Sequence, residues 1–509
     1  MAKRSSVAVF IFLLAFTVYS FFQFPGFQGY EDETYNRVVE NLAKGEFKTV
    51  RSGYAQIVLE TPFVFFGWKL GEVLGICVNQ ATHLFANFYN PFISAVTAAI
   101  FFLIAGLFTN LRRAFWAALA FAFLTMAFPY AGIGMEPTGL FFLLTSTYFL
   151  LRFGKYKDNW NLILSGALYF LLLFSKAYYF VTFPAFLVYL GLLQVTCLQA
   201  RQAGYKLQAT KNFIKQCVMF FLPLIIIFPV YLLANKYNFG VYFGGAYNLR
   251  VELLGGDNIL FGFYGLLLSF GKSILIYNPI LILGLFFLKR FYNQHKKEAV
   301  FLVLFSLCLL LFVSWMHWWS DETWGPRYLL AFIFPPTLLL AAAKRQDFRF
   351  SGAKKTAFAV FTSFIVAWSL FMQLLGTLSR YDVFPYTFSE IHAKTGYNVV
   401  ASQEYQYIPQ FAPYLVNYQL IKNKILSRND PLRYRMLYTP PMELAAKEKG
   451  REVTKEIAYD NNKYQAHVLN FWWQNVPRIP PYYFLVLYGA IFMGLFWWGR
   501  KLLKSDVDE

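Results

Sequence analysis

The chain has 509 residues, of which 58% are hydrophobic and only 14% are charged. Soluble domains carry about 25% charged residues, so the composition excludes a large soluble protein and predicts an all-α polytopic membrane protein. The formal net charge of +19 could suggest nucleic acid as a partner. About half of the basic residues, however, fall in loops on one predicted side of the membrane, as the positive-inside rule expects. We therefore expect membrane lipids, and no nucleic acid, as partners.

Apolar runs of roughly 20 residues, the length that crosses a bilayer, recur along the chain. We expect about twelve spans, within a range of about eleven to thirteen. They lie near residues 7–24, 91–108, 114–131, 137–152, 160–174, 177–194, 216–234, 273–289, 299–316, 327–343, 356–376 and 481–499. The first run is expected to be a retained signal anchor, because no small-residue cleavage site follows it. Basic residues flank alternate ends of the runs, which predicts that both termini lie in the cytoplasm.

The spans divide the chain into three parts. Residues 1–376 are predicted to form a transmembrane bundle that includes a first external loop at 25–90. Within that loop, charged residues interrupt the apolar stretch 61–75, which we expect to lie in the membrane interface. Residues 377–480 are too long for a plain connection and are predicted to form a small external cap segment. Residues 481–509 hold the last span and a cytoplasmic tail.

Two adjacent carboxylates, Asp32 and Glu33, follow the first apolar run. A charge close to the membrane is costly unless it stays solvated or has a function. A carboxylate here could take a proton from an acceptor hydroxyl. It could also hold a divalent metal ion, Mg²⁺ or Mn²⁺, through its oxygens. The alternative is a solvated helix start, where acidic side chains favour the positive end of the helix dipole.

Two more ionisable residues stand at the predicted outer ends of spans. Glu136, in the segment GIGMEPTG, opens a span from the outside. It could cap its helix, or it could face the same external cavity as Asp32. Lys176, in the segment SKAYY, lies in a very short outer turn. It could extend to the membrane surface or pair with a phosphate, and the sequence leaves both alternatives open.

The segment SFGKSILIYNPILIL places Lys272 at the end of a predicted external loop, 235–272, and at the start of a span. The fragment GKS is not a P-loop, because the glycine required upstream is missing and an apolar helix follows. Lys272 is therefore a candidate contact for a phosphate, with a plain structural role as the alternative.

The densest ionisable cluster lies in the segment WMHWWSDETWGPRYLL. It contains His317, Asp321, Glu322 and Arg327. The aromatic belt at the membrane interface accounts for the Trp residues, but not for so many ionisable groups in one short outer turn. The guanidinium of Arg327 could make bidentate contacts with a phosphate. External acids and cations beside an apolar bundle suit a lipid-linked phosphate as one substrate and a hydroxyl acceptor as the other.

The segment DETYNRVVENLAKG, residues 32–45, resembles the first outer loop of the GT-C glycosyltransferases, such as protein O-mannosyltransferase-like and aminoarabinose-transferase-like bacterial enzymes. GKSILIYNPILIL and WGPRYLLAFIFP resemble further segments of bacterial members, so that the resemblance covers roughly residues 1–376. It implies an integral-membrane enzyme at the periplasmic face of the bacterial inner membrane. Such an enzyme transfers a hexose or pentose from a polyprenyl-phosphate donor to a hydroxyl acceptor in a glycan, a lipid or a protein.

The resemblance also implies roles for individual residues. Asp32 would be the general base or the acid that organises a metal, with Glu33 beside it, and Glu136 would be a second outer acid. Lys272 and Arg327 would contact the donor phosphate. Further substrate contacts are expected from Lys176, Tyr277, His317, Asp321 and Glu322. Asp321 and Glu322 lie in a turn that is neutral in relatives. They could therefore bind a metal, contact the sugar or pair with Arg327.

The implied chemistry is direct displacement at the anomeric carbon with inversion. This reaction needs no enzyme nucleophile, in agreement with the lack of a Ser-His or Cys-His signature. One alternative is a transporter or flippase of a lipid-linked sugar, although transporters place polar residues near the midplane and often show repeats. Another is an O-antigen-ligase-type enzyme with a diphosphate donor, which would not need the acid in the first loop.

Overall fold

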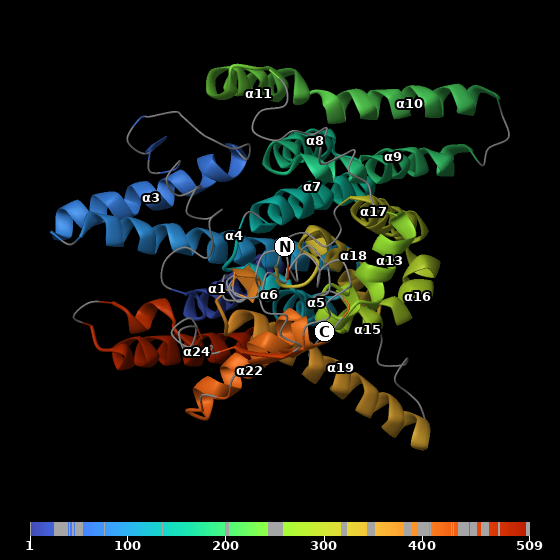
Figure 1. Ribbon diagram of the computed structural model, residues 1–509. Helices are drawn as coiled ribbons and strands as arrows, with labels where there is room; N and C mark the ends of the chain where they lie inside the picture. Colours follow the sequence, from blue (N-terminus) through green and yellow to red (C-terminus); the bar gives the residue numbers. More distant parts are fainter. Residues whose placement is uncertain are drawn as a thin grey trace.

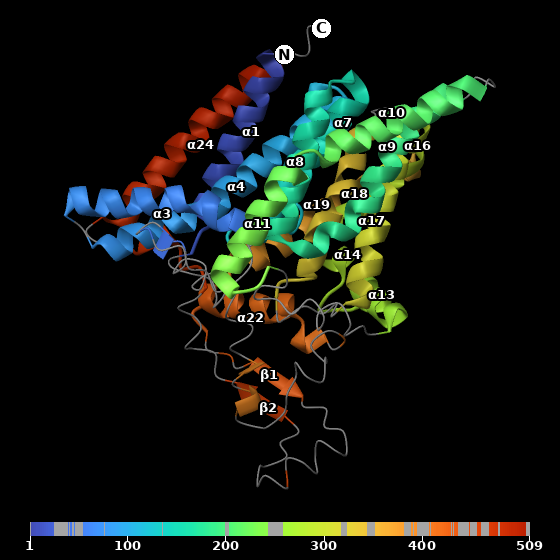
Figure 2. The same ribbon diagram turned by 90° about the horizontal axis from the view of Figure 1, so that it is seen from above.

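The computed structural model describes residues 2–24, 54–75, 77–134, 136–198, 203–242, 258–316, 323–343, 352–380, 409–428, 468–476 and 479–504, with short pieces at 39, 41–42, 45, 388–389, 391–393, 407, 430, 432–435, 447 and 456–459. These residues form a bundle of helices (Figure 1). A small two-stranded sheet lies beyond one end of the bundle (Figure 2).

The first helices build one side of the bundle. They are α1 (Ala2–Phe21), α3 (Tyr54–Leu74), α4 (Val78–Phe108), α5 (Leu111–Phe123) and α6 (Ala127–Tyr130). Helices α3 and α4 form a hairpin whose backbones approach closely at Gly67, where a Cβ atom would lie 2.7 Å from the carbonyl oxygen of Ala81. Helix α1 packs between α4 and the last helix, α24 (Pro481–Lys504).

A second hairpin places the start of one helix beside the end of the next. It consists of α7 (Glu136–Tyr156), α8 (Asn159–Ser175), the 3₁₀ helix η1 (Ala177–Thr182) and α9 (Phe183–Leu198). Ser146 and Ser165 join α7 to α8, because each hydroxyl donates to the backbone carbonyl of the other residue, at 2.8 and 2.9 Å. Since α8 runs back along α7, Glu136 and Lys176 lie at the same end of this hairpin.

The rest of the chain completes the bundle. Helices α10 (Ala203–Phe221) and α11 (Leu224–Phe239) lie at its edge, where few of their residues are buried (Figure 1). The following elements are α13 (Ile259–Leu268), α14 (Ile274–Tyr277), α15 (Ile280–Phe286), α16 (Leu288–Gln294), α17 (Lys296–Trp315), η2 (Arg327–Ile333), α18 (Phe334–Leu339), η3 (Leu340–Ala342) and α19 (Ala353–Thr377).

The segment predicted to be external contains little regular structure in its described parts. It has η5 (Pro409–Phe411), α22 (Pro413–Ile425), β1 (Leu432–Arg435), β2 (Glu456–Tyr459) and η7 (Trp472–Gln474). Strands β1 and β2 pair antiparallel, with Leu432 opposite Tyr459. Helix α22 packs against α19. The indole nitrogens of Trp472 and Trp473 donate to the carbonyl oxygens of Ser20 and Phe21, at 2.7 and 2.9 Å, and so join η7 to the end of α1.

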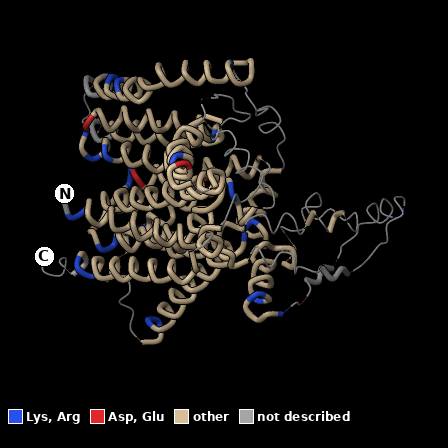
Figure 3. The backbone as a smooth tube through the Cα atoms, turned by 90° about the vertical axis from the view of Figure 1, so that its left-hand side faces the viewer, with Lys and Arg blue, Asp and Glu red and all other residues tan. Residues whose placement is uncertain are grey.

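Seven helices among the described residues are long and apolar enough to cross a membrane, and the pieces 159–175, 259–268 and 327–342 are shorter apolar helices. The prediction of an all-α polytopic membrane protein is therefore confirmed, with the small sheet as a minor addition. The number of about twelve spans stays a prediction. The beginning of α1 and the end of α24 lie at the same end of the bundle (Figure 2), as an even number of crossings requires. Lys and Arg gather at helix ends on that side (Figure 3).

The helices differ from the predicted runs in three places. Helix α4 begins at Val78, inside the predicted first loop, rather than at residue 91. The predicted loop 235–272 contains helix α13. The predicted span 273–289 is not one helix but α14 and α15, followed by the start of α16. Pro279 has no N–H to donate, and the side chain of Asn278 donates to the carbonyl oxygen of Ile274 at 3.0 Å, so the chain breaks there.

Candidate functional site

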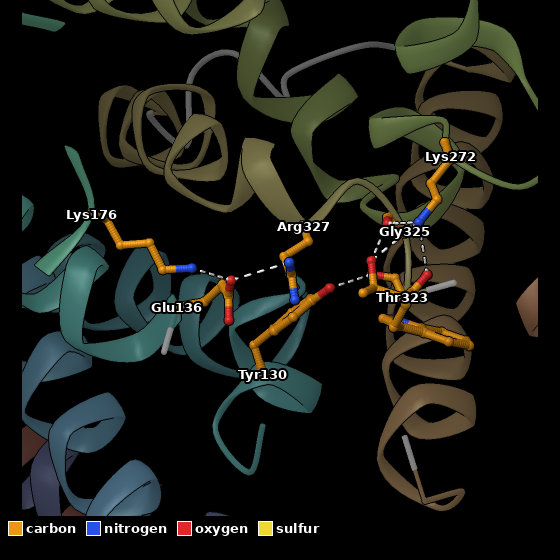
Figure 4. A network of polar contacts seen from close by, with 8 residues as sticks. Tyr130, Glu136, Lys176, Lys272, Thr323, Gly325 and Arg327 are labelled. Carbon is orange, nitrogen blue, oxygen red and sulfur yellow. Dashed lines mark hydrogen bonds and ion pairs between the residues drawn. The ribbon is translucent and has the colours of Figure 1, made fainter. Parts of the chain in front are cut away.

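Three ionisable side chains meet inside the bundle. Lys176 Nζ lies 2.6 Å from Glu136 Oε1, and Arg327 Nε lies 3.4 Å from the same oxygen (Figure 4). The side chain of Glu136 is 1% exposed, and those of Lys176 and Arg327 are each 9% exposed. One carboxylate therefore stands between two buried cations, and these three side chains together carry one net positive charge.

Local structure explains why the three side chains converge. Glu136 is the first residue of α7, and Lys176 is the residue that ends α8 with an extended backbone. Gly139, one turn into α7, leaves room for the chain after Lys176, because a Cβ atom there would lie 3.0 Å from the ring of Tyr179. Arg327 begins η2 directly after Pro326. The site thus depends on three chain segments that are separated by 40 residues or more.

Lys272 lies nearby but makes a different set of contacts. It is fully buried, and its ammonium donates to the carbonyl oxygens of Thr323 and Gly325, at 3.0 and 2.9 Å, and to the hydroxyl of Thr323 at 3.1 Å (Figure 4). An ammonium has three donors, and these three oxygens match them. Lys272 thus holds the turn that leads into Arg327, and its predicted contact with a phosphate stays a prediction.

The same turn is fixed from two further sides. The hydroxyl of Tyr130 donates to the carbonyl oxygen of Trp324 at 2.8 Å. The rings of Tyr277 and Trp324 meet edge to face, with centroids 5.1 Å apart. Gly325 has a φ of +61°, in the left-handed region that favours glycine. Tyr277, which we predicted as a substrate contact, therefore packs against the turn, and its role toward a substrate stays a prediction.

Half of the predicted site residues lie outside the described residues. They are Asp32, Glu33, His317, Asp321 and Glu322. Their predicted roles, including the general base and the metal ligands, therefore stay predictions. Among the residues that the structure describes, no group of three or more His, Cys, Asp or Glu side chains gathers as a metal site.

Aromatic residues that sequence reasoning passed over surround the ion cluster. The guanidinium of Arg327 lies 5.3 Å from the ring centroid of Tyr328. The ring of Tyr178 meets Tyr328 edge to face at 5.5 Å and stacks on Tyr179 at 4.3 Å. The segment SKAYY carried the signal, since two Tyr follow Lys176 directly. Only the Lys was selected, because aromatic residues are common throughout the chain.

A second buried carboxyl group, Glu60 on α3, was also passed over. It is 3% exposed, and the amide of Gln56 donates to it at 3.3 Å. Burial raises the pKa of Glu60 to about 7. Glu60 lies close enough to interact with Tyr89, whose hydroxyl shares a 2.8 Å hydrogen bond with Thr138. Tyr89 on α4 thus joins the first turn of α7, close to Glu136 in sequence, and lies within electrostatic range of Glu60 on α3.

The arrangement is suited to binding an anion. Two cations held by one carboxylate oxygen can bind a phosphate with modest rearrangement, and the guanidinium can do so in bidentate fashion. Low solvent access strengthens these interactions. The cluster also lies at the opposite end of the α7–α8 hairpin from Arg152, Lys155 and Lys157, the basic residues that we assigned to the cytoplasmic side.

No protein-family model matches the chain, and a comparison with curated protein sequences finds no match. The structure is similar to that of AglB, the archaeal oligosaccharyltransferase from Archaeoglobus fulgidus, in complex with an inhibitory peptide and a dolichol-phosphate. The TM-score is 0.50 at 10% sequence identity, over 92% of this chain and 64% of AglB. A structure of an oligosaccharyltransferase from the same organism, tethered with an acceptor peptide, gives a TM-score of 0.49 at 12% identity, over 81% of this chain and 59% of that one.

The chain spans less than two thirds of the length of both oligosaccharyltransferases. At such low identity the similarity concerns the fold alone. This similarity of fold agrees with the helical bundle that we predicted from the composition. The chain thus shares a polytopic helical fold with the oligosaccharyltransferase AglB.

Proposed function

We propose that the protein is a glycosyltransferase that moves a sugar from a polyprenyl-phosphate donor to a hydroxyl acceptor at the outer face of a bacterial inner membrane. The observation that carries the proposal is the buried cluster of Glu136, Lys176 and Arg327. It offers two cations to an anion at the end of the bundle away from the predicted cytoplasmic loops. The shared fold supports the enzyme class, and the AglB structure of that fold contains a dolichol-phosphate.

The proposed reaction is a direct displacement. The acceptor hydroxyl oxygen forms a bond to the anomeric carbon while the bond from that carbon to the phosphate oxygen breaks, which inverts the anomeric configuration. Polyprenyl phosphate leaves with the electron pair, and Lys176 and Arg327 stabilise its negative charge. The acceptor proton passes to a carboxylate, and we assign this role to Asp32 on the basis of the sequence.

The decisive experiment is sugar transfer in purified membranes. A panel of labelled polyprenyl-phosphate sugars is offered to the wild type and to Asp32→Asn. Glu40→Gln, in the same predicted loop, serves as a matched control. We expect transfer from one donor by the wild type and by Glu40→Gln, and a loss of at least about 100-fold in Asp32→Asn, the lower range for a general base.

The outcomes separate the alternatives. Equal transfer by Asp32→Asn and the wild type would remove Asp32 from the mechanism. Movement of a labelled lipid across the membrane without formation of a glycosidic bond would favour a flippase. Transfer from no monophosphate donor would overturn the proposed function.

A further inference from the structure

Two phenol groups stand beside the ion cluster. Tyr178 and Tyr179 follow Lys176 directly in η1, and their rings stack with centroids 4.3 Å apart and an angle of 30° between the planes. Tyr179 is fully buried. Its carbonyl oxygen accepts hydrogen bonds from the hydroxyls of Tyr169 and Thr182, at 3.1 and 2.8 Å, so the backbone that carries both phenols is fixed.

Three polar atoms at this place lack partners from the rest of the described protein. The hydroxyl oxygens of Tyr178 and Tyr179 are buried, face each other, and make no hydrogen bond to another described residue. Glu136 Oε2 is also buried and accepts no hydrogen bond there, since Lys176 and Arg327 contact Oε1. Both phenols lie near enough to Glu136 for an electrostatic interaction.

Such a group of atoms needs an explanation. Buried polar groups in folded proteins are nearly always paired, and an unpaired one costs about 1–3 kcal/mol. Here two hydroxyl donors lie within electrostatic range of a carboxylate acceptor, and Lys176 and Arg327 contact the same carboxylate. A ligand that satisfies them must offer both acceptors and donors, and it must tolerate the negative charge of Glu136.

We propose that Tyr178, Tyr179 and Glu136 Oε2 bind the hydroxyl groups of the sugar on the lipid-linked donor. Sugar hydroxyls donate to a carboxylate oxygen and also accept from phenol hydroxyls. An ionised phosphate lacks such donors, so it would leave Glu136 Oε2 without a hydrogen bond. The sugar would therefore lie against the phenols while its phosphate lies against Lys176 and Arg327. This inference rests on the proposed function, because it assigns the sugar half of the same substrate.

The test replaces single hydroxyls without changing ring packing. Tyr178→Phe and Tyr179→Phe are purified in detergent, and Tyr169→Phe serves as the matched control because its hydroxyl already has partners within the protein. Binding is measured for polyprenyl phosphate and for polyprenyl-phosphate glucose, mannose and arabinose. Thermal unfolding is measured for each variant.

We expect both variants to bind polyprenyl phosphate as the wild type does. Each should bind the preferred sugar-bearing lipid roughly 3- to 10-fold more weakly, the effect of one hydrogen bond between neutral groups. Their melting temperatures should change little, since among the described residues the two phenol hydroxyls face only each other. A purely structural role would instead lower the melting temperature, as we expect for Tyr169→Phe.

Three results would overturn the inference in different ways. If both variants bind every lipid as the wild type does, water alone satisfies the phenols, and the proposed phosphate site stands. If affinity for polyprenyl phosphate and for the sugar-bearing lipids falls equally, the phenols do not contact the sugar. If the wild type binds neither kind of lipid, the proposed function fails, and the inference fails with it.

Discussion

Replacement of Glu136 by Gln is the sharpest test of the ion cluster. The substitution keeps the size of the side chain but removes the negative charge that compensates two cations, each 9% exposed. Loss of one partner from a buried pair typically costs about 3–5 kcal/mol, because the remaining charge stays buried. We expect a loss of this order in the free energy of unfolding of Glu136→Gln, measured by tryptophan fluorescence in mixed detergent micelles.

Two comparisons make the result specific. Glu72→Gln breaks the pair with Lys69, whose nitrogen lies 2.9 Å from the Glu72 carboxylate but whose side chain is 47% exposed, so it should cost less than about 1 kcal/mol. Glu136→Gln/Lys176→Met removes one charge of each sign and should recover more than about 1 kcal/mol relative to additivity. Polyprenyl phosphate should stabilise Glu136→Gln more than the wild type, since the anion replaces the lost carboxylate. Equal stability of Glu136→Gln and the wild type, or strict additivity in the double variant, would refute the ion cluster.

Two other variants test residues near the cluster. Lys272→Met removes the three hydrogen bonds that the buried ammonium donates to Thr323 and Gly325 and should lower the free energy of unfolding by about 3 kcal/mol; exposed Lys236→Met, which loses a contact to a carbonyl oxygen, should cost less than about 1 kcal/mol. Glu60 has its pKa raised from 4.5 to about 7 by burial, so the wild type loses stability as the pH rises through that interval. Glu60→Gln should therefore gain stability relative to the wild type, by up to about 3 kcal/mol, between pH 4.5 and pH 7; a pH-independent difference in unfolding titrations would contradict this.

The fold class followed from composition because apolar runs in a membrane protein have few structural solutions. Boundaries were predicted less well where helices break or extend under tertiary control. The break at Asn278 and Pro279 has a visible cause in Pro279, but the side chain of Asn278 also accepts from the backbone N–H of Met126 at 2.6 Å. That contact depends on a residue 152 positions away, and no local pattern contains it.

The arrangement of the candidate site residues likewise depends on contacts between distant parts of the chain. Glu136, Lys176 and Arg327 were each selected from the sequence, since ionisable residues at the ends of spans are uncommon without a function. Their convergence on one carboxylate oxygen was not predicted, because it depends on how α7, α8 and η2 return to one another. Tyr178 and Tyr179 were missed because Tyr is abundant in this chain, with 35 residues, and their burial without partners is visible only in three dimensions.

The three cations that we selected as phosphate contacts differ in the protein oxygens that they contact. The ammonium of Lys272 directs its donors at three protein oxygens within 3.1 Å, so a phosphate would have to displace the turn that positions Arg327. Lys176 and Arg327 instead both contact one carboxylate oxygen, Oε1 of Glu136. An incoming phosphate therefore competes with a single oxygen of Glu136, and the cations are already in place before it arrives. Preorganisation of this kind reduces the cost of binding, and it explains why a buried carboxylate is kept within a site for an anion.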